Sequence, residues 1–180
     1  MKKLLIITAL TAVLGCDQIS SSHLSKYTGQ AYNHAASATP GVLNTAITPS
    51  EKSQINISFD FQIGKDFSSG PQYQNLFQTA DFNTGIRLEL AKENHWAILV
   101  GDKTGKSKGF DLGVLPTNGE WHKFKIEISN GEIVALLDNK TIITGQLEPK
   151  TFQVDHVLIG QGFSSERAFN GEIRDFLIEM

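Results

Sequence analysis

The acidic side chains of this 180-residue chain do not have the spacing of a catalytic pair. Glycoside hydrolysis needs two carboxyl groups on either side of the scissile bond, about 5.5 Å apart in retaining enzymes. The nearest pairs are Glu89 with Glu93 and Glu172 with Asp175, and both have the wrong spacing. Glu93 is expected in the turn that follows Glu89, so we interpret these charges as solvated. The chain also lacks the His-Glu-x-x-His and Gly-x-Ser-x-Gly motifs, and we predict that it is not an enzyme.

A glycine-rich segment from Gly101 to Ser107 has the residue types of a phosphate loop but not its spacing. A phosphate loop has four residues between its glycines and leads into a helix whose amide groups bind phosphate. Here three residues separate Gly101 from Gly105, and no helical pattern follows. We therefore expect a flexible hairpin loop and no nucleotide site.

Charge and cysteine content exclude two further classes of function. Sixteen Lys and Arg against 19 Asp and Glu give a net charge of −3, which argues against a nucleic-acid binder with a basic surface. The single Cys excludes disulfide frameworks and multi-thiolate zinc sites.

The N-terminus is organised as a bacterial signal peptide. A basic head precedes an apolar run of 11 residues, Leu4 to Leu14, which is too short to cross a bilayer as a helix. The sequence Val13-Leu14-Gly15-Cys16 resembles the bacterial lipobox, whose Cys becomes the acylated mature N-terminus. The resemblance implies a signal peptide over residues 1–15 and a lipoprotein that Cys16 anchors to the inner or outer membrane of the cell envelope. The alternative is an ordinary cleaved signal with a free Cys16.

From residue 26 onward the apolar residues recur with a period of two. Residues 16–25 are polar and rich in Ser, and we expect them to form a flexible tether. The clearest strand is Ile55–Ile63, in which five apolar side chains share one face. The same alternation predicts strands over Gly85–Leu90, His95–Val100 and Trp121–Ser129.

Turn signals between these strands predict antiparallel hairpins. Asn130-Gly131 supplies the positive φ values of a two-residue turn, and this pairs Trp121–Ser129 with Glu132–Leu137. Asp138 to Lys140 should then turn the chain into Thr141–Gly145. Because each strand has one polar face, two sheets must stack. The sequence therefore predicts an all-β, two-sheet antiparallel sandwich.

Three segments resemble the laminin-G and concanavalin-A-like lectin/glucanase superfamily. Asn118 to Asp138, NGEWHKFKIEISNGEIVALLD, has the Gly-x-Trp-His entry to a strand that members of this family often show. Val157–Ile178 resembles the family's closing segment and Lys26–Asn33 its opening strand. The resemblance implies a jelly-roll domain over residues 26–180, with its first and last strands side by side. The Glu-x-Asp-x-x-Glu pattern of the family's glycanases does not occur.

Three conspicuous residues near these motifs receive structural interpretations. Trp96 is in phase with core positions and is expected in the core, and Trp121 is expected in the core or as a plug at the sheet edge. His122 should face the opposite side from Trp121 and make a hydrogen bond.

The resemblance also implies a candidate calcium site. Many relatives hold Ca²⁺ at a sheet rim through oxygen ligands from two loops, and Ca²⁺ prefers six to eight oxygens. After Gly160-Gln161, however, pentraxin-like relatives have acidic residues where this chain does not. A metal-free loop is the alternative. The candidate ligands are Asp81, Asn83, Gln161 and Glu166.

We expect ligand recognition in the loops over residues 66–74, 80–84, 101–111 and 161–170, because a rigid scaffold positions them. Aromatic rings there could stack on sugars or on a protein partner, or they could pack inward as anchors of their loops, and two arginines could bind an acidic glycan. These candidates are Tyr73, Phe82, Arg87, Phe110, Phe163 and Arg167. The leading hypothesis is a lipid-anchored, non-catalytic binding module of the bacterial envelope with a glycan ligand. A structural or protein-interaction subunit is the main alternative, and a glycoside hydrolase the third.

Overall fold

The computed structural model describes residues 50–64, 73–80, 83–90, 95–116, 119–148, 150–160, 162 and 167–180, together with the backbone of three short strands before them. No α-helix occurs in this described part of the chain, and hence none that could span a bilayer. The strands are β1 (Leu24–Tyr27), β2 (Tyr32–Asn33), β3 (Gly41–Val42), β4 (Ser50–Lys52), β5 (Gln54–Ile63), β6 (Gln74–Gln78), β7 (Gly85–Leu90), β8 (His95–Gly101), β9 (Ser107–Val114), β10 (Trp121–Ser129), β11 (Glu132–Leu137), β12 (Lys140–Gln146), β13 (Phe152–Val154), β14 (Leu158–Ile159) and β15 (Gly171–Glu179).

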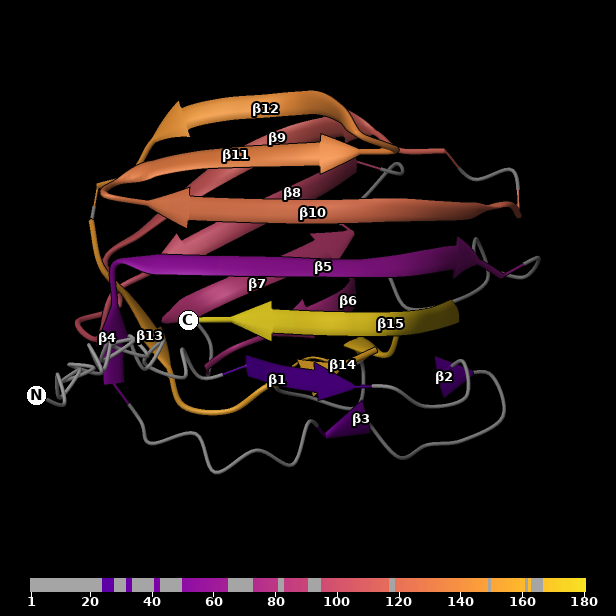
Figure 1. The fold of residues 1–180 in the computed structure, drawn as a ribbon, viewed down its shortest axis with the longest axis horizontal. Helices are drawn as coiled ribbons and strands as arrows, with labels where there is room; N and C mark the ends of the chain where they lie inside the picture. Colours follow the sequence, from indigo (N-terminus) through magenta and orange to yellow (C-terminus); the bar gives the residue numbers. More distant parts are fainter. Residues whose placement is uncertain are drawn as a thin grey trace, which may run out of the picture.

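Two antiparallel sheets stack face to face (Figure 1). The front sheet has the order β1-β15-β5-β10-β11-β12, with β2 also beside β15, and the back sheet has the order β3-β14-β6-β7-β8-β9. A ribbon of β4 and β13 lies at one end (Figure 1). The predicted all-β sandwich is therefore confirmed, and β1 and β15, the first and last described strands, are neighbours.

Alternation along β5 builds the centre of the core. Its odd-numbered residues face the back sheet and are buried, and Phe59 lies in the middle of them. The ring of Phe59 stacks on Phe176 at 5.5 Å, and its centroid lies 5.7 Å from those of Phe77 and Phe124. Phe77 belongs to the back sheet, so this aromatic cluster joins the two layers. Trp96 is fully buried in the same core, as expected.

The hairpin turns follow the sequence signals. Asn130 and Gly131 have φ values of 53° and 84° and connect β10 to β11, which pair from Ser129 with Glu132 to Phe124 with Leu137. Asp138 and Asn139 have φ values of 49° and 64° and form the next turn. Both turns have positive φ at two successive residues, as the twist of a two-residue hairpin requires.

The side chain of Asp138 also fixes the start of β10. Its carboxylate accepts a hydrogen bond from Nδ1 of His122 at 2.8 Å and another from the amide of Lys123 at 2.9 Å. Burial alone would raise the pKa of Asp138, but these hydrogen bonds and the nearby charges of His122 and Lys140 hold the pKa below its usual range. His122 makes the hydrogen bond predicted for it. Its ring lies on the core side of the sheet, 8% exposed.

The strand β9 was not predicted, because its residues from Ser107 to Asp111 were assigned to the loop over 101–111. Phe110 lies inside this strand and is 9% exposed, so its ring packs in the core and does not face a ligand. The ring closes one side of the sandwich against Gly145 of β12, where an added Cβ would lie 2.5 Å from Cε1 of Phe110. This correction removes Phe110 from the candidate binding residues.

Candidate functional site

Polar side chains gather on the outer face of the back sheet, where β6 and β7 lie side by side. Antiparallel register places Asn75 opposite Glu89 and Gln78 opposite Arg87. Directly opposed residues point to the same face of a sheet. Each pair belongs to a row of residues that crosses the sheet. The row of Glu89 continues on β8 and β9 with Ala97 and Asp111, and the row of Arg87 continues with Leu99 and Gly109.

Two arginines share one carboxylate in this cluster. Oε2 of Glu89 lies 2.9 Å from Nε of Arg87 and accepts a hydrogen bond of 2.7 Å from Nη1 of Arg167. The guanidinium of Arg167 lies over the ring of Tyr73, 5.1 Å from its centroid. The side chains of Arg87 and Glu89 are 7% and 11% exposed, that of Arg167 is 22% exposed, and Tyr73 is 40% exposed. We call these four residues the arginine–tyrosine cluster, and its surface consists of Tyr73 and part of Arg167.

Burial strengthens the electrostatics of the arginine–tyrosine cluster. Desolvation lowers the pKa of Arg87, the carboxylate of Glu89 opposes this shift, and the neighbouring Arg167 lowers the pKa further. An arginine nevertheless stays protonated in proteins. The three charged groups therefore sum to +1 next to an exposed aromatic ring, which is a favourable setting for an anionic ligand group.

A second layer of polar residues lies beside the cluster. Nδ2 of Asn75 donates to Oε1 of Gln78 at 3.3 Å, and Nε2 of Gln78 lies 3.5 Å from Nε2 of His156. Asn75 and Gln78 are fully buried although they are on the outer face of the sheet. Gly162 packs directly on Asn75, because an added Cβ would lie 2.4 Å from its Nδ2. Glycine is needed at this close approach.

The other side of the outer face carries small side chains and a second ion pair. Nothing lies within 4 Å of the position where a Cβ on Gly109 would stand, so the surface is open there. Nδ1 of His95 lies 3.4 Å from Oδ1 of Asp111, and both side chains are exposed. The amide of Gly113 also donates to Asp111 at 2.7 Å, and these contacts lower the pKa of Asp111, with the Gly113 hydrogen bond as the largest cause.

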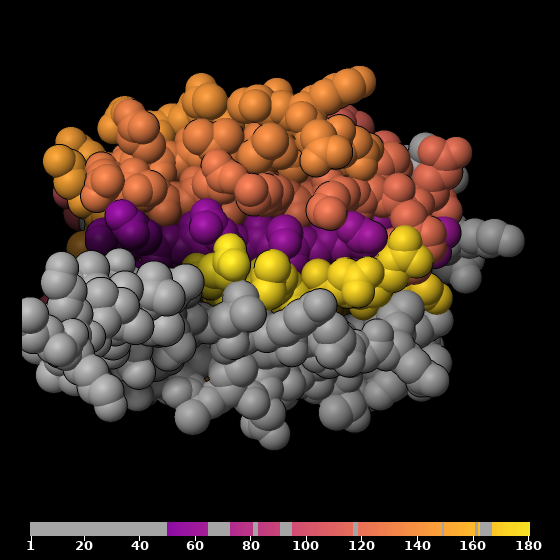
Figure 2. Space-filling model, in the orientation of Figure 1, coloured from indigo at the N-terminus to yellow at the C-terminus, as the bar shows by residue number. Residues whose placement is uncertain are grey.

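A separate aromatic–arginine pair lies on the outer face of the front sheet, the face that Figure 2 shows with β5 running between β10 and β15. The guanidinium of Arg174 stacks on Trp121 at 3.9 Å from the ring centroid and reaches Asp60 at 3.4 Å. Trp121 is partly exposed and pairs with Gln62, so of its two predicted positions, in the core or as a plug at the sheet edge, the core position was wrong. It is in phase with Lys123, whose side chain is exposed.

A bulge in β15 lies next to this pair. Among the described non-glycine residues with positive φ, Asp175 at 51° is the one inside a strand, and the others are in hairpin turns. The register with β5 shifts between Arg174 and Leu177. A bulge of this kind changes the direction of neighbouring side chains.

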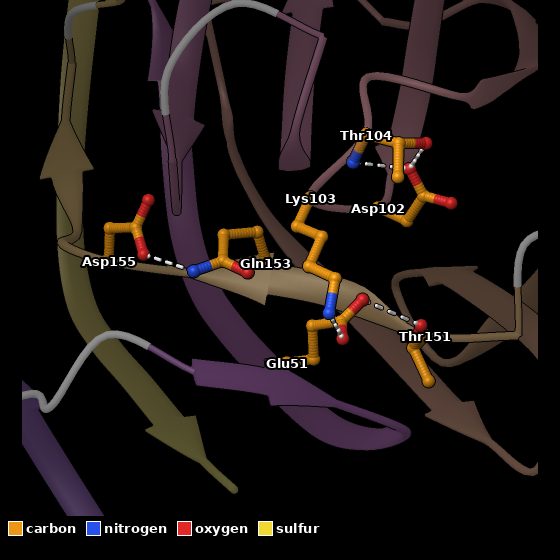
Figure 3. Close-up of polar contacts among 7 residues, drawn as sticks. All are labelled: Glu51, Asp102, Lys103, Thr104, Thr151, Gln153 and Asp155. Atoms are coloured by element: carbon orange, nitrogen blue, oxygen red, sulfur yellow. Dashed lines mark hydrogen bonds and ion pairs between the residues drawn. The ribbon is translucent and has the colours of Figure 1, made fainter.

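The hairpin between β8 and β9 has no phosphate cradle. One carboxylate oxygen of Asp102 accepts hydrogen bonds from the amides of Thr104 and Lys106, at 2.8 and 3.1 Å, and from the Thr104 hydroxyl at 2.6 Å. The hydroxyl bond is the largest cause of a lowered Asp102 pKa. Lys103 reaches from this hairpin to Glu51 of β4, 3.0 Å away (Figure 3). The amides of Thr104 and Lys106 therefore bind Asp102, and the Lys103–Glu51 ion pair attaches the hairpin to the β4–β13 ribbon.

Solved structures share this fold. A botulinum neurotoxin serotype D binding domain has a TM-score of 0.64 at 16% identity, over 89% of this chain and 44% of its own. The receptor-binding domain of botulinum neurotoxin D has a TM-score of 0.63 at 14% identity, over 89% and 45%. The binding domain of botulinum neurotoxin DC in complex with SialylT has a TM-score of 0.56 at 16% identity, over 70% and 32%.

The likeness establishes the fold. No family model matches the chain, and no curated protein matches it. This chain spans less than half of the binding domains that it resembles, so their ligands belong to those larger proteins. At these identities the neighbours assign no individual residue of the site.

The structure brings together three of the predicted binding residues, Tyr73, Arg87 and Arg167. It also shows that the interpretation of Glu89 as a solvated charge was wrong, because Glu89 is buried between the two arginines. Arg87 is likewise held inside the protein by Glu89, so it positions the cluster and has little surface for a ligand. The predicted residues that lie outside the described part of the chain are Cys16, Asp81, Phe82, Gln161, Phe163 and Glu166.

Asn83 is the one predicted calcium ligand within the described residues. Its backbone carbonyl packs on Gly101, where an added Cβ would lie 1.7 Å from the carbonyl oxygen. No group of three or more His, Cys, Asp or Glu side chains in the described ranges could hold a metal ion. The calcium hypothesis stays a prediction, since its other residues are outside those ranges.

Sequence reasoning did not identify the buried polar residues that surround the candidate binding residues Arg87 and Arg167. Glu89, Asn75 and Gln78 are polar residues on the outer face of their strands, and alternation alone assigns such positions to solvent. Arg167 contacts Glu89 and Gly162 packs on Asn75, and both contacting residues are far away in the sequence. Arg174 could have been paired with Trp121 only with the register of β15 on β5.

Proposed function

We propose that the protein is a lipid-anchored, non-catalytic binding module of the bacterial cell envelope, and that it binds glycans carrying an acidic group. The observation that carries this proposal is the position of Arg167, whose guanidinium lies between the exposed ring of Tyr73 and the carboxylate of Glu89. The ring supplies a stacking surface for a sugar, and the guanidinium is a donor matched to a carboxylate or sulfate.

The binding surface extends from the arginine–tyrosine cluster across the back sheet. From β6 to β9 it crosses three strand spacings, which is about 14 Å. The small residues Ala97 and Gly109 lie along this path, and His95 with Asp111 is at its far side. We propose that an oligosaccharide chain, longer than one sugar unit, lies along this path.

The location in the envelope is supported by the lipobox-like sequence at Cys16, which is the only Cys in the chain. A binding role is supported by the fold, since the structural neighbours are binding domains and one of them is in complex with SialylT. Protein interaction, the main alternative, would favour a broad apolar surface. Among the described residues the large hydrophobic side chains that are exposed are Tyr73 and Val114, and two residues do not make such a surface.

A glycan array tests the ligand proposal. The soluble domain from residue 24 onward is applied with Ca²⁺ and with EDTA, as wild type, Tyr73→Ala and Arg174→Ala. We expect binding to acidic glycans that Tyr73→Ala weakens about two- to tenfold, because one stacking contact of about 0.5–1.5 kcal/mol is removed. Arg174→Ala, which removes an arginine from the other sheet, should bind as wild type does. No glycan binding in either buffer, or loss of binding in Arg174→Ala alone, would contradict the proposal.

The anchor is tested in cells. Wild-type protein should incorporate labelled palmitate and sediment with membranes. The Cys16→Ala variant should do neither, because acyl chains on Cys16 are the proposed membrane anchor. Palmitate-free protein recovered from the wild-type strain would refute the anchor without affecting the glycan assay.

A further inference from the structure

The chain enters the sandwich at one end of the front sheet. Strand β1 pairs with β15 so that Leu24 lies opposite Glu179, and Glu179 lies opposite Asn56 of β5. The first described residue is therefore level with the beginning of β5. In Figure 1 this is the side on which the C-terminus is marked.

Both aromatic–arginine pairs lie at the other end. Trp121 is opposite Gln62, close to the last residue of β5. On the back sheet, Gln74 accepts a hydrogen bond of 2.7 Å from the amide of Asn170, and the carbonyl of Asn170 accepts one from Gly64. Gly64 directly follows β5, and Tyr73 directly precedes Gln74. Tyr73, the most exposed residue of the arginine–tyrosine cluster, is therefore also at the end where β5 finishes.

The separation of the two ends is larger than the average span of the proposed flexible tether. Asn56 and Ile63 are seven residues apart along β5, which is about 23 Å. Cys16 and Leu24 are eight residues apart, a span of about 16 Å if the segment is as flexible as its composition predicts, and at most about 28 Å if extended. The tether therefore holds the entry end within about 16–28 Å of the bilayer, and the other end can extend about 23 Å farther from the membrane.

We infer that the end of the binding surface that carries Tyr73 and Arg167 points away from the bilayer that anchors the protein, and that the ligand belongs to a glycan layer beyond that bilayer. This inference rests on the proposed anchor at Cys16 for its direction and on the register of β1 with β15 for its geometry. The protein then bridges a membrane and a glycan layer, and a glycolipid of its own membrane is not its ligand.

Two positions on β10 provide a matched pair of distance probes. Ser129 is at the end where the chain enters and Lys123 is about 20 Å away toward the binding end, and both are exposed on the same face. Lipidation consumes the one native thiol, so a maleimide dye reacts only at Ser129→Cys or Lys123→Cys. The lipidated full chain is placed in phosphatidylcholine vesicles that contain a lipid with a nitroxide headgroup.

We expect the nitroxide lipid to quench the dye at position 129 at least twofold more than the dye at position 123. Equal quenching, or stronger quenching at position 123, would overturn the orientation. Protein without palmitate on Cys16 would overturn the anchor, and this failure is visible before any quenching is measured. Thermal unfolding of each labelled variant controls for misfolding.

A second arm separates the two sources of glycan. Isolated peptidoglycan sacculi, which carry carboxylates, should sediment vesicles that contain the wild-type protein, and vesicles with Tyr73→Ala should need a several-fold higher concentration of sacculi to sediment equally. Lipopolysaccharide mixed into the same vesicles should not compete. Competition by that lipopolysaccharide, or no sedimentation by sacculi, would overturn the assignment of the ligand to a layer beyond the bilayer.

Discussion

Replacing Glu89 by Gln is the most informative single change in the arginine–tyrosine cluster. The variant keeps the size of the side chain and removes the carboxylate that lies 2.9 Å from Nε of Arg87 and 2.7 Å from Nη1 of Arg167. Since Arg87 is 7% exposed, its charge would stay in the protein without that partner. Breaking a buried ion pair from one side costs about 3–5 kcal/mol.

We expect Glu89→Gln to lower the free energy of unfolding by about 3 kcal/mol and Tm by about 6–12 °C, since 1 kcal/mol shifts Tm by about 2–4 °C in a domain of this size. Urea unfolding and calorimetry measure both quantities. The matched control is Glu127→Gln, which removes the partner of Lys125 on the exposed face of the front sheet, where both side chains are 43% exposed. That loss should be about 0.5 kcal/mol or less.

A double variant distinguishes a buried charge from lost packing. Glu89→Leu with Arg87→Met removes both buried charges and keeps the volume of the side chains, and it should be at least about 1 kcal/mol more stable than Glu89→Gln. If Glu89→Gln costs no more than Glu127→Gln, the arginines are not desolvated. The reasoning about the cluster would then be wrong.

Three further changes test the scaffold. Phe59→Ala should lower the unfolding free energy in urea by about 3–5 kcal/mol, because its ring contacts both sheets, and a loss under 1 kcal/mol would contradict the packing. Gly145→Val should cost about 1–3 kcal/mol by displacing Phe110, whereas no measurable loss would mean that the two strand edges are not in contact. Asp138 has a lowered pKa in the folded protein, so its contribution to stability is present above about pH 4 and is lost as the pH falls through the folded pKa. Asp138→Asn should therefore lose less stability than wild type between pH 5 and pH 3 in urea titrations, and an equal loss would contradict the sign.

The architecture could be predicted from local patterns, because the apolar residues of a strand alternate with a period of two and the residues between two strands indicate the turn. Ile55–Ile63 alternates without error, and the structure extends this strand by one residue to Gln54. Asn130-Gly131 predicted both the turn and the pairing of β10 with β11. Strand β9 was missed because Gly109 and Gly113 weaken its alternation, and its pairing comes from β8.

The candidate site could be predicted only in part, because its residues meet through contacts that are distant in the sequence. Tyr73 and Arg167 were chosen for their chemistry and their place in loops, and the structure puts one over the other. Glu89, which joins Arg167 to Arg87, was assigned to solvent because alternation says which side of a sheet a residue faces and not what covers that side. Trp121 was expected in the core or as a plug at the sheet edge, although its phase with Lys123 indicates the outer face.

The most direct test of the central claim is a map of the amides that respond to a ligand. The ¹⁵N-labelled domain is titrated with the acidic oligosaccharide that binds most strongly on the array, and the chemical shifts are followed. We predict that the shifts concentrate on the outer face of the back sheet, around Tyr73, Ala97 and Gly109, and that Lys123 and Lys125 on the front sheet do not respond. Saturable shifts confined to the front sheet would contradict the account.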